Sequence, residues 1–385
     1  MTILRPFGAL FVALLGLSIG ASAARHRMIV GTFSTESLYT VEYDDATEEL
    51  ALVAQSAVSA ASSWITLNHD KTRLYGTDWN AREPTWVSYD VTDPYHIKPD
   101  ARIVAGSLCS GTKSIFVTAH PSAPFAVYGN YYGGDARCST VLSVHDNGTL
   151  RGVIQEYVYG PGSGVHGTAI TPDGAFLLSA DTAGNLLWTH RIDKATGILS
   201  NVSAVNAPSA GSAPRHVAVH GSGGYAYVVL QDVSAVAQYR ISREDGTLSL
   251  AGAVHPLLRE GEDDPADYWA DEVALSPSGR YLWATNRARP ADDDGAGGGG
   301  GRRGYVAAFE LGPTGEIARQ LFLRETSTSG GFANSAAASP FDDALAALAD
   351  NATGFVEIWH VDRGVVAHLD IQDGGGCCAN AVWLD

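Results

Sequence analysis

One eight-residue turn phrase recurs six times along this chain and restricts the fold more than any other feature. Two clear copies are Thr171-Pro-Asp-Gly-Ala-Phe-Leu-Leu178 and Ser276-Pro-Ser-Gly-Arg-Tyr-Leu-Trp283, in which a tight turn leads into an apolar run. The copies occupy residues 68–75, 120–127, 171–178, 220–227, 276–283 and 339–346. A spacing of about 50 residues, with strand-like runs between the turns, is typical of the blades of a β-propeller.

A short apolar run precedes each turn phrase, and a seventh such run ends the chain without a turn after it. The seven runs are residues 63–67, 114–118, 166–171, 215–219, 272–275, 334–338 and 379–384. At the N-terminal end, residues 27–33 and 37–43 are strand-like segments of a unit that has no first strand of its own. Six complete units and one unit shared between the termini predict an all-β, seven-bladed β-propeller. Pairing of the C-terminal strand with the N-terminal strands would close the ring and remove an open sheet edge.

Glycine-containing hairpin turns mark the outer edge of several units, for example Asn147-Gly-Thr-Leu150 and Asp245-Gly-Thr-Leu248. No useful stretch of the chain after residue 23 shows the period of an amphipathic helix. We therefore expect one propeller domain over residues 24–385.

The composition narrows the choice of partner. The formal net charge of −17 and the pI near 5.0 make a nucleic acid an unfavourable partner for the surface as a whole. A local group of cations can still bind a small anion, so the net charge does not exclude an anionic small-molecule ligand.

The N-terminus predicts a secretory signal peptide over residues 1–23. Arg5 supplies the positive charge, a short apolar run follows, and Ala21-Ser-Ala23 matches a signal-peptidase site. The run is too short to favour a membrane span, although an uncleaved anchor is the alternative. Three glycosylation sequons, beginning at Asn147, Asn201 and Asn351, fit a secreted, extracellular protein.

The four cysteines show no spacing of the metal-binding type. Cys109 and Cys138 lie in turn-rich segments of one repeat, where a disulfide can form. Cys377 and Cys378 are adjacent, and residues of a strand alternate between its faces. We expect one of these two to be buried and the other to be a free or loop-paired thiol.

The entrance of each first strand predicts the lining of the central channel. In chain order, the residues at these positions are Trp64, Lys113 or Ser114, His166, Arg215 with His216, Asp271 with Glu272, Asn334 and Asn380. The ends of the second strands add a further set, which comprises Asp181, Gln231 and either Arg287 or Arg289. Such a polar ring favours a functional mouth. The alternative is that the arginines pair with the acidic residues in a structural network.

The residue types at this mouth indicate carboxylate chemistry. Two arginines can each bind a carboxylate bidentately, and a histidine beside them can transfer a proton. The sequence has neither a GxSxG nucleophile motif nor an HExxH metal motif. A calcium site made from Asp271, Glu272, Asn286 and Asn334 is less favoured, because the neighbouring arginines would repel a divalent cation.

Several stretches of the chain resemble the fungal 3-carboxy-cis,cis-muconate lactonizing enzymes, members of the seven-bladed lactonase propellers that include bacterial 6-phosphogluconolactonase. The stretches are His166-Gly167, Ser179-Ala-Asp181, Leu187-Trp-Thr-His-Arg191, Pro214-Arg215 with His220, Gln320-Leu-Phe-Leu323, Thr328-Ser-Gly-Gly331 and Asn380-Ala-Val-Trp383. The resemblance covers essentially all of the chain after residue 23.

The resemblance implies that a muconate is closed to a lactone without a metal, by a histidine, two arginines and a glutamate. The histidine corresponds to His166 and the arginines to Arg215 and Arg287, whereas Gln231 stands where the family has its glutamate. Ser329-Gly-Gly-Phe332 stands where the family has Ser-Gly-Gly-His. Residues expected to contact the substrate are Trp64, His216, Glu272 and Asn334.

The sequence thus predicts a secreted, metal-independent lactonizing cycloisomerase that acts on a muconate-like di- or tricarboxylate and uses no cofactor. Two alternatives stay open: a lactone hydrolase of the 6-phosphogluconolactonase type, and a non-catalytic extracellular binding propeller with a degenerate site. We expect no nucleic-acid partner and no membrane contact after signal cleavage. The oligomeric state is not predicted.

Overall fold

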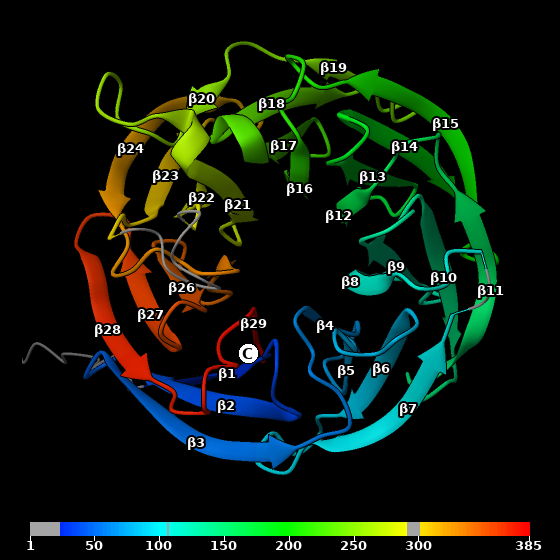
Figure 1. Ribbon diagram of the computed structural model, residues 1–385, viewed down its shortest axis with the longest axis horizontal. Coiled ribbons are helices and arrows are strands. Elements are labelled where there is room, and N and C mark those ends of the chain that lie inside the picture. The colour runs from blue at the N-terminus through cyan, green and yellow to red at the C-terminus, as the bar shows by residue number, and fades with distance from the viewer. Residues whose placement is uncertain (1–23, 106–107, 291–300) are drawn as a thin grey trace, which may run out of the picture.

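Each sequence repeat forms one antiparallel sheet, and seven sheets are arranged in a ring (Figure 1). The computed structural model describes residues 24–105, 108–290 and 301–385. The predicted signal peptide, residues 1–23, lies outside the described residues. The predicted all-β, seven-bladed propeller is confirmed.

The first four blades follow the chain from its N-terminus, apart from one strand contributed by the C-terminus. The first contains β29 (Ala381–Trp383), β1 (Arg25–Val30), β2 (Ser37–Asp44) and β3 (Glu49–Ala57). The second contains β4 (Ile65–Leu67), β5 (Arg73–Thr77), β6 (Thr85–Asp90) and β7 (Lys98–Val104). The third contains β8 (Lys113–Ala119), β9 (Val127–Tyr132), β10 (Cys138–Val144) and β11 (Leu150–Val158). The fourth contains β12 (Val165–Ile170), β13 (Phe176–Asp181), β14 (Leu186–Ile192) and β15 (Leu199–Asn206).

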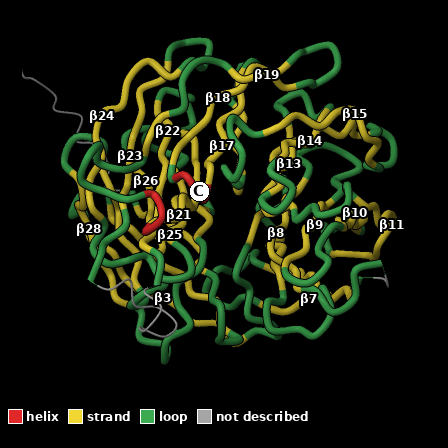
Figure 2. Tube along the Cα trace, turned by 45° about the horizontal axis from the view of Figure 1, so that its top comes forward, coloured by secondary structure: helices red, strands yellow, loops and turns green. Residues whose placement is uncertain are grey.

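The remaining three blades complete the ring. The fifth contains β16 (Pro214–Val219), β17 (Tyr225–Leu230), β18 (Ala235–Ile241), β19 (Leu248–Leu250) and β20 (His255–Pro256). The sixth contains β21 (Tyr268–Leu275), β22 (Tyr281–Ala288), β23 (Tyr305–Leu311) and β24 (Ile317–Glu325). The seventh contains β25 (Asn334–Ala338), β26 (Leu345–Asp350), β27 (Phe355–His360) and β28 (Gly364–Asp370). Two short 3-10 turns, η1 (Gln231–Val233) and η2 (Pro265–Asp267), are the helical segments in the described residues (Figure 2).

The termini close the ring as predicted. β29 pairs antiparallel with β1, with Met28 opposite Trp383 and Val30 opposite Ala381. The Leu384 amide donates a further hydrogen bond of 2.8 Å to the carbonyl of Arg27. In Figure 1 the red C-terminal strand lies beside the blue N-terminal strands. β29 therefore supplies the innermost strand of the first blade and covers the inner edge of β1.

The innermost strand of every blade lies toward the centre of the ring, and the fourth strand lies at the rim (Figure 1). Apolar side chains from facing sheets fill the space between neighbouring blades. Trp86 of the second blade is fully buried and packs against the third. A Cβ atom on Gly129 would stand 2.2 Å from the Trp86 ring, so the close approach of these two sheets requires a glycine there. Apolar burial of this kind is the main force that holds blade to blade.

The prediction for one pair of cysteines is confirmed and that for the other is wrong. Cys109 and Cys138 form a disulfide. Cys377 and Cys378 are bonded to each other, and both are buried. The strand begins only at Ala381, so the alternation of faces that holds in a strand does not apply to this loop. Among the described residues, no helix has the length and apolar character needed to cross a membrane.

Candidate active site

Irregular pairing at the start of three consecutive inner strands creates the site. The pairing register with the second strand shifts around His166 in β12, around Arg215 and His216 in β16, and around Asp271 and Glu272 in β21. Shifts of this kind release a strand from strict alternation and redirect side chains, and they are frequent beside active sites. These five polar residues come from three neighbouring blades.

A glycine lets two of these strands approach each other. The Cβ that Gly167 lacks would lie 2.5 Å from the Cδ2 atom of the His216 ring and 2.8 Å from the Arg215 carbonyl oxygen. Any larger residue at this position would push β12 away from β16. The neighbouring His166 is thereby brought within hydrogen-bonding distance of His216.

A cavity of about 930 Å³ opens beside these residues. His166, Arg215, Arg287 and Gln231 all line it. The four residues that we predicted to act in catalysis therefore share one cavity, although they come from three blades. Their roles remain predictions, since geometry alone does not assign them.

Asp271 lies between the two arginines. Arg215 makes an ion pair with the Asp271 carboxylate and donates a hydrogen bond of 2.6 Å to its backbone carbonyl. The Arg287 Nε atom is 3.8 Å from the same carboxylate, and its Nη1 donates to the Phe332 carbonyl at 2.8 Å. Among the described residues, the Nε atoms of both arginines lack a hydrogen-bond partner. The arginines belong partly to a structural network, as the alternative interpretation held, and both also line the cavity.

The charge state of this cluster favours anions. Burial alone would raise the pKa of Asp271, but Arg215, Arg287 and the Asn334 amide outweigh it and lower that pKa. Burial lowers the pKa of Arg287 to about 10, so this guanidinium stays protonated at neutral pH. Two cations and one carboxylate leave a local excess of one positive charge.

His166, His216 and Glu272 form a hydrogen-bonded row behind the cavity. The His166 Nδ1 atom is 2.9 Å from His216 Nε2, and His216 Nδ1 is 2.8 Å from a Glu272 carboxylate oxygen. Burial, and then the charge of Arg215, lowers the pKa of both histidines well below the ordinary value. Burial raises the pKa of Glu272 well above that of a free carboxyl, and the Asp271 charge adds to this shift. The row therefore favours neutral groups.

Aromatic rings form a wall along another side of the cavity. Phe332, Phe33, Trp79 and Tyr132 follow one another, with ring centroids 6.0, 5.9 and 5.7 Å apart. Tyr132 then lies 6.4 Å from the His166 ring. Phe332 and Tyr132 are about half exposed, at 52% and 50%. The cavity thus has a cationic side and an aromatic side.

The residues predicted to contact the substrate lie deeper. Trp64, His216 and Glu272 line a narrow space of about 20 Å³ beside the cavity, which is too small for an organic substrate. The Trp64 ring packs 4.8 Å from the His216 ring. Asn334 is fully buried and donates a hydrogen bond of 2.8 Å to the Asn286 carbonyl, so its side chain supports the structure. None of these four residues is part of the cavity lining.

The aromatic wall was not predicted from the sequence, although a signal for it exists. We placed residues from the ends of second strands at the mouth for three blades only. Tyr132 ends β9, and Trp79 follows β5 by two residues, so the same rule applied to the second and third blades identifies both. The other two rings lie in loops, and no repeat position marks them.

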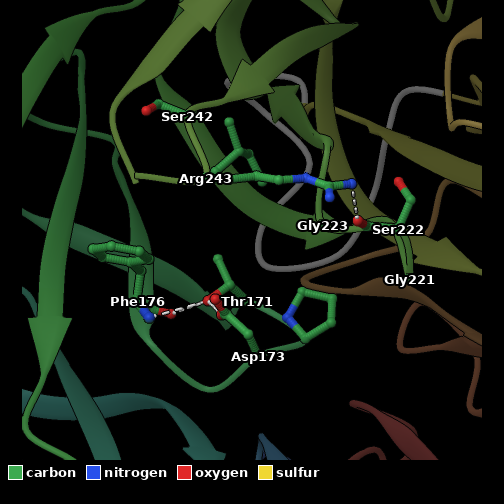
Figure 3. A pocket seen from close by; sticks show the side chains of 10 residues that line it. Thr171, Asp173, Phe176, Gly221, Ser222, Gly223, Ser242 and Arg243 are labelled. Atoms are coloured by element: carbon green, nitrogen blue, oxygen red, sulfur yellow. Dashed lines mark hydrogen bonds between the residues drawn. The ribbon is translucent and has the colours of Figure 1, made fainter. Parts of the chain in front are cut away.

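Two other features of the described residues do not compete with this site. No group of three or more His, Cys, Asp or Glu side chains there is arranged to hold a metal ion. A second hollow, of about 360 Å³, lies among the turn phrases at the opposite ends of the same strands (Figure 3). Its arginine, Arg243, is exposed and donates to the Ser222 carbonyl at 3.1 Å. No buried charged side chain lines this hollow.

Comparison with known proteins identifies the family and the fold. The family described as "Lactonase, 7-bladed beta-propeller" matches residues 27–364. The carboxy-cis,cis-muconate cyclase of Neurospora crassa is 32% identical over 94% of this chain and 99% of its own length. The muconate cycloisomerase 1 of Cutaneotrichosporon cutaneum is 28% identical over 90% of this chain and 94% of its own.

A solved structure extends the comparison to the fold. The periplasmic gluconolactonase of Pseudomonas aeruginosa superposes with a TM-score of 0.76 at 19% identity, covering 94% of this chain and 99% of that chain. At this identity the likeness concerns the fold alone. The family match and the fungal relative together show that this chain belongs to the lactonase family of seven-bladed β-propellers.

Proposed function

We propose that this protein is a lactonizing cycloisomerase whose substrate is a planar, unsaturated di- or tricarboxylate of the muconate type. The observation that carries the proposal is the shared cavity, in which His166, Arg215, Arg287 and Gln231 face an aromatic wall. Two fungal relatives named for muconate chemistry support the same substrate class.

The arginines bind the carboxylates. Each guanidinium can donate two parallel hydrogen bonds to a carboxylate, and their charge is only partly neutralised by Asp271. The low exposure of Arg215 and Arg287, 7% and 8%, reduces the screening of these contacts by water. A substrate with two carboxylates can engage both guanidinium groups.

The aromatic wall suits a flat carbon skeleton. A conjugated diene can pack against Trp79 and Tyr132, whose rings are inclined by 36°, where it gains dispersion and buries apolar area. The C–H face of a sugar can also pack on such rings, so the wall does not rank the two reactions. The two relatives named for muconate chemistry, at 32% and 28% identity, rank the cycloisomerase above a sugar-lactone hydrolase.

The reaction needs one new bond and one proton. A substrate carboxylate oxygen attacks an alkene carbon, the C–O bond forms, and the π electrons move to the neighbouring carbon. Arg215 and Arg287 stabilise the negative charge that spreads into the conjugated carboxylate. His166 gives its Nε2 proton to the neighbouring carbon, which completes the lactone. Gln231 is neutral at every pH, so it hydrogen-bonds the substrate and takes no proton.

The test compares lactonization with hydrolysis in the same preparation. Purified protein is given cis,cis-muconate and carboxy-cis,cis-muconate, and loss of the diene absorbance is followed with product detection by NMR. Gluconolactones are assayed in parallel by acid release. The proposal predicts lactone formation from a muconate. Acid release alone would favour the lactone hydrolase, and binding without turnover would favour the non-catalytic propeller.

We also propose that the protein is secreted. Two disulfides among the described residues fit an oxidising compartment. Asn147 and Asn201 are exposed, whereas Asn351 is half-buried and donates to the Cys377 carbonyl at 3.4 Å. We therefore expect glycans at Asn147 and Asn201 in preference to Asn351. N-terminal sequencing and peptide mass spectrometry of material from the culture medium test this, and an intact Met1 in the cell extract would contradict it.

A further inference from the structure

The row of His166, His216 and Glu272 connects the cavity to a buried carboxyl group. Its two internal hydrogen bonds, of 2.9 and 2.8 Å, join side chains from β12, β16 and β21. We propose that the row is a proton relay, in which Glu272 stores the proton that His166 delivers to the substrate. This inference rests on the proposed function and adds two residues to its machinery.

The surroundings of the row isolate it from solvent. His216 is 2% exposed and Glu272 is 6% exposed. The rings of Trp64 and Phe116 lie 4.8 and 5.3 Å from the His216 ring. The second carboxylate oxygen of Glu272 accepts a hydrogen bond of 2.9 Å from the Val273 amide. The adjoining space of about 20 Å³ has room for a single water molecule at most.

The contacts of the row define two states that differ by one proton. In the first, the Glu272 carboxylate accepts from His216 Nδ1–H, and His216 Nε2 accepts from His166 Nδ1–H. The His166 Nε2 atom then has a lone pair. In the second, protonated Glu272 donates to His216 Nδ1, and His216 Nε2–H donates to His166 Nδ1. His166 Nε2 then has a proton to give.

Conversion of the second state into the first balances the reaction. As the substrate carbon takes the His166 Nε2 proton, His166 Nδ1 takes a proton from His216, and His216 Nδ1 takes one from Glu272. Neither imidazole becomes charged, and Glu272 ends as a carboxylate. After the lactone leaves, a proton enters from solvent at His166 and passes back to Glu272.

The electrostatics around the row favour this route over an isolated imidazolium. The charged groups that face it are Arg215 of β16, Arg287 of β22 and Asp271 of β21, and the Tyr132 ring of β9 lies 6.4 Å from the His166 ring. The two guanidinium groups and burial oppose positive charge on His166 and His216. A neutral relay that ends on a carboxyl group avoids that cost.

The variant that removes the proton store is Glu272→Gln, which keeps the shape and the hydrogen bond to His216. At pH 7.5 we expect kcat for lactonization to fall about 100-fold with little change in KM, because a general acid contributes at least that factor. Part of the loss should return as the pH is lowered toward the depressed pKa of His166, because the protonated fraction of that imidazole then rises. Glu272→Asp retains a titratable group and should recover part of the activity at pH 7.5.

The matched control is Glu357→Gln. Glu357 is also buried, at 2% exposure, and also bonds a histidine, with His368 Nδ1 at 3.1 Å. It lies in the seventh blade outside the cavity lining, so its loss should lower stability without moving the pH profile. An unchanged pH profile in Glu272→Gln, with a stability loss like that of the control, would overturn the relay.

A second readout works without any turnover. In the free protein, ¹⁵N NMR of the histidine rings, assigned with His166→Gln and His216→Gln, reports which nitrogen carries a proton. We expect both rings to exchange Nε2–H for Nδ1–H together in one titration, and this step to vanish in Glu272→Gln. Rings that keep fixed tautomers across the pH range would overturn the relay. Absence of lactonization alongside the coupled exchange would instead refute the proposed function and leave the relay standing.

Discussion

Replacement of Asp271 by asparagine should weaken the fold and strengthen carboxylate binding. Asp271 is 1% exposed and is the carboxylate that the Arg215 and Arg287 side chains share. At 3.8 Å and an effective dielectric constant of about 20, the attraction to Arg287 alone is ~4 kcal/mol before desolvation is subtracted. Loss of one partner from a buried ion pair costs about 3–5 kcal/mol in measured cases. Because asparagine keeps the shape, we expect ~3 kcal/mol.

This loss is measurable as a shift of the unfolding midpoint. With an unfolding entropy of ~2.1 cal/mol/K per residue, 3 kcal/mol lowers the Tm of a chain of this length by ~4 °C. The pKa of Asp271 is lowered in the folded state, so its stabilisation is present above the ordinary carboxyl pKa and disappears as pH falls through the folded value. The difference between the wild type and the variant should therefore shrink below about pH 4.

A bound carboxylate should compensate for the missing charge. Adipate, a saturated dicarboxylate with the chain length of muconate, is added to both proteins during thermal unfolding. A ligand at 100 times its Kd stabilises by about 2.7 kcal/mol, and the variant, with two uncompensated guanidinium groups, should bind adipate more tightly than the wild type. The larger adipate-induced Tm shift should therefore belong to Asp271→Asn.

Asp350→Asn is the matched control for this experiment. Asp350 is fully buried, and it accepts hydrogen bonds from the Ala352 and Thr353 amides at 2.9 and 3.2 Å. No ion pair with a cation joins it in the described parts of the chain. Its replacement should lower the Tm without a gain in adipate stabilisation. An adipate shift in Asp271→Asn no larger than in the wild type would refute the reasoning.

Three further predictions follow from the same geometry. Arg215→Ala and Arg287→Ala should each weaken adipate binding by about 1.5–3 kcal/mol in calorimetry. His166→Ala should leave adipate binding unchanged and lower kcat about 100-fold. Equal losses of binding in all three variants would contradict the separate roles of the arginines and the histidine. Gln231→Glu should raise lactonizing activity by adding a titratable carboxylate to the cavity, and a fall in kcat/KM would show that this charge repels the substrate. Deletion of residues 378–385 removes β29 from the first blade and should lower the unfolding midpoint; unchanged unfolding would count against closure of the ring.

The fold was predictable because each repeat carries its own signal. The turn phrases locate the blades, and the unpaired run at residues 379–384 indicates the closure that β29 makes with β1. Strand boundaries were less certain. β21 begins at Tyr268, earlier than the predicted residue 272, because Tyr268 pairs with Ala288 across a register shift that the sequence does not mark.

The sequence predicted which residues share the cavity better than it predicted their contacts. Repeat positions placed His166, Arg215 and either Arg287 or Arg289 at one mouth, and the family resemblance selected Arg287. They could not show that His216 and Glu272 lie behind His166, because register shifts in three strands set those directions. The bond between Cys377 and Cys378 depends on the local loop, which alternation of faces does not describe.

The proposed reaction can be tested most directly by the origin and the position of one proton. Carboxy-cis,cis-muconate is incubated with the purified protein in D₂O, and the product is analysed by NMR. We predict a lactone that carries one deuterium, on one face of the carbon next to the new C–O bond, and loss of this product with His166→Gln. Absence of lactone, or an equal mixture of deuterium on both faces, would contradict proton delivery by His166 in this cavity.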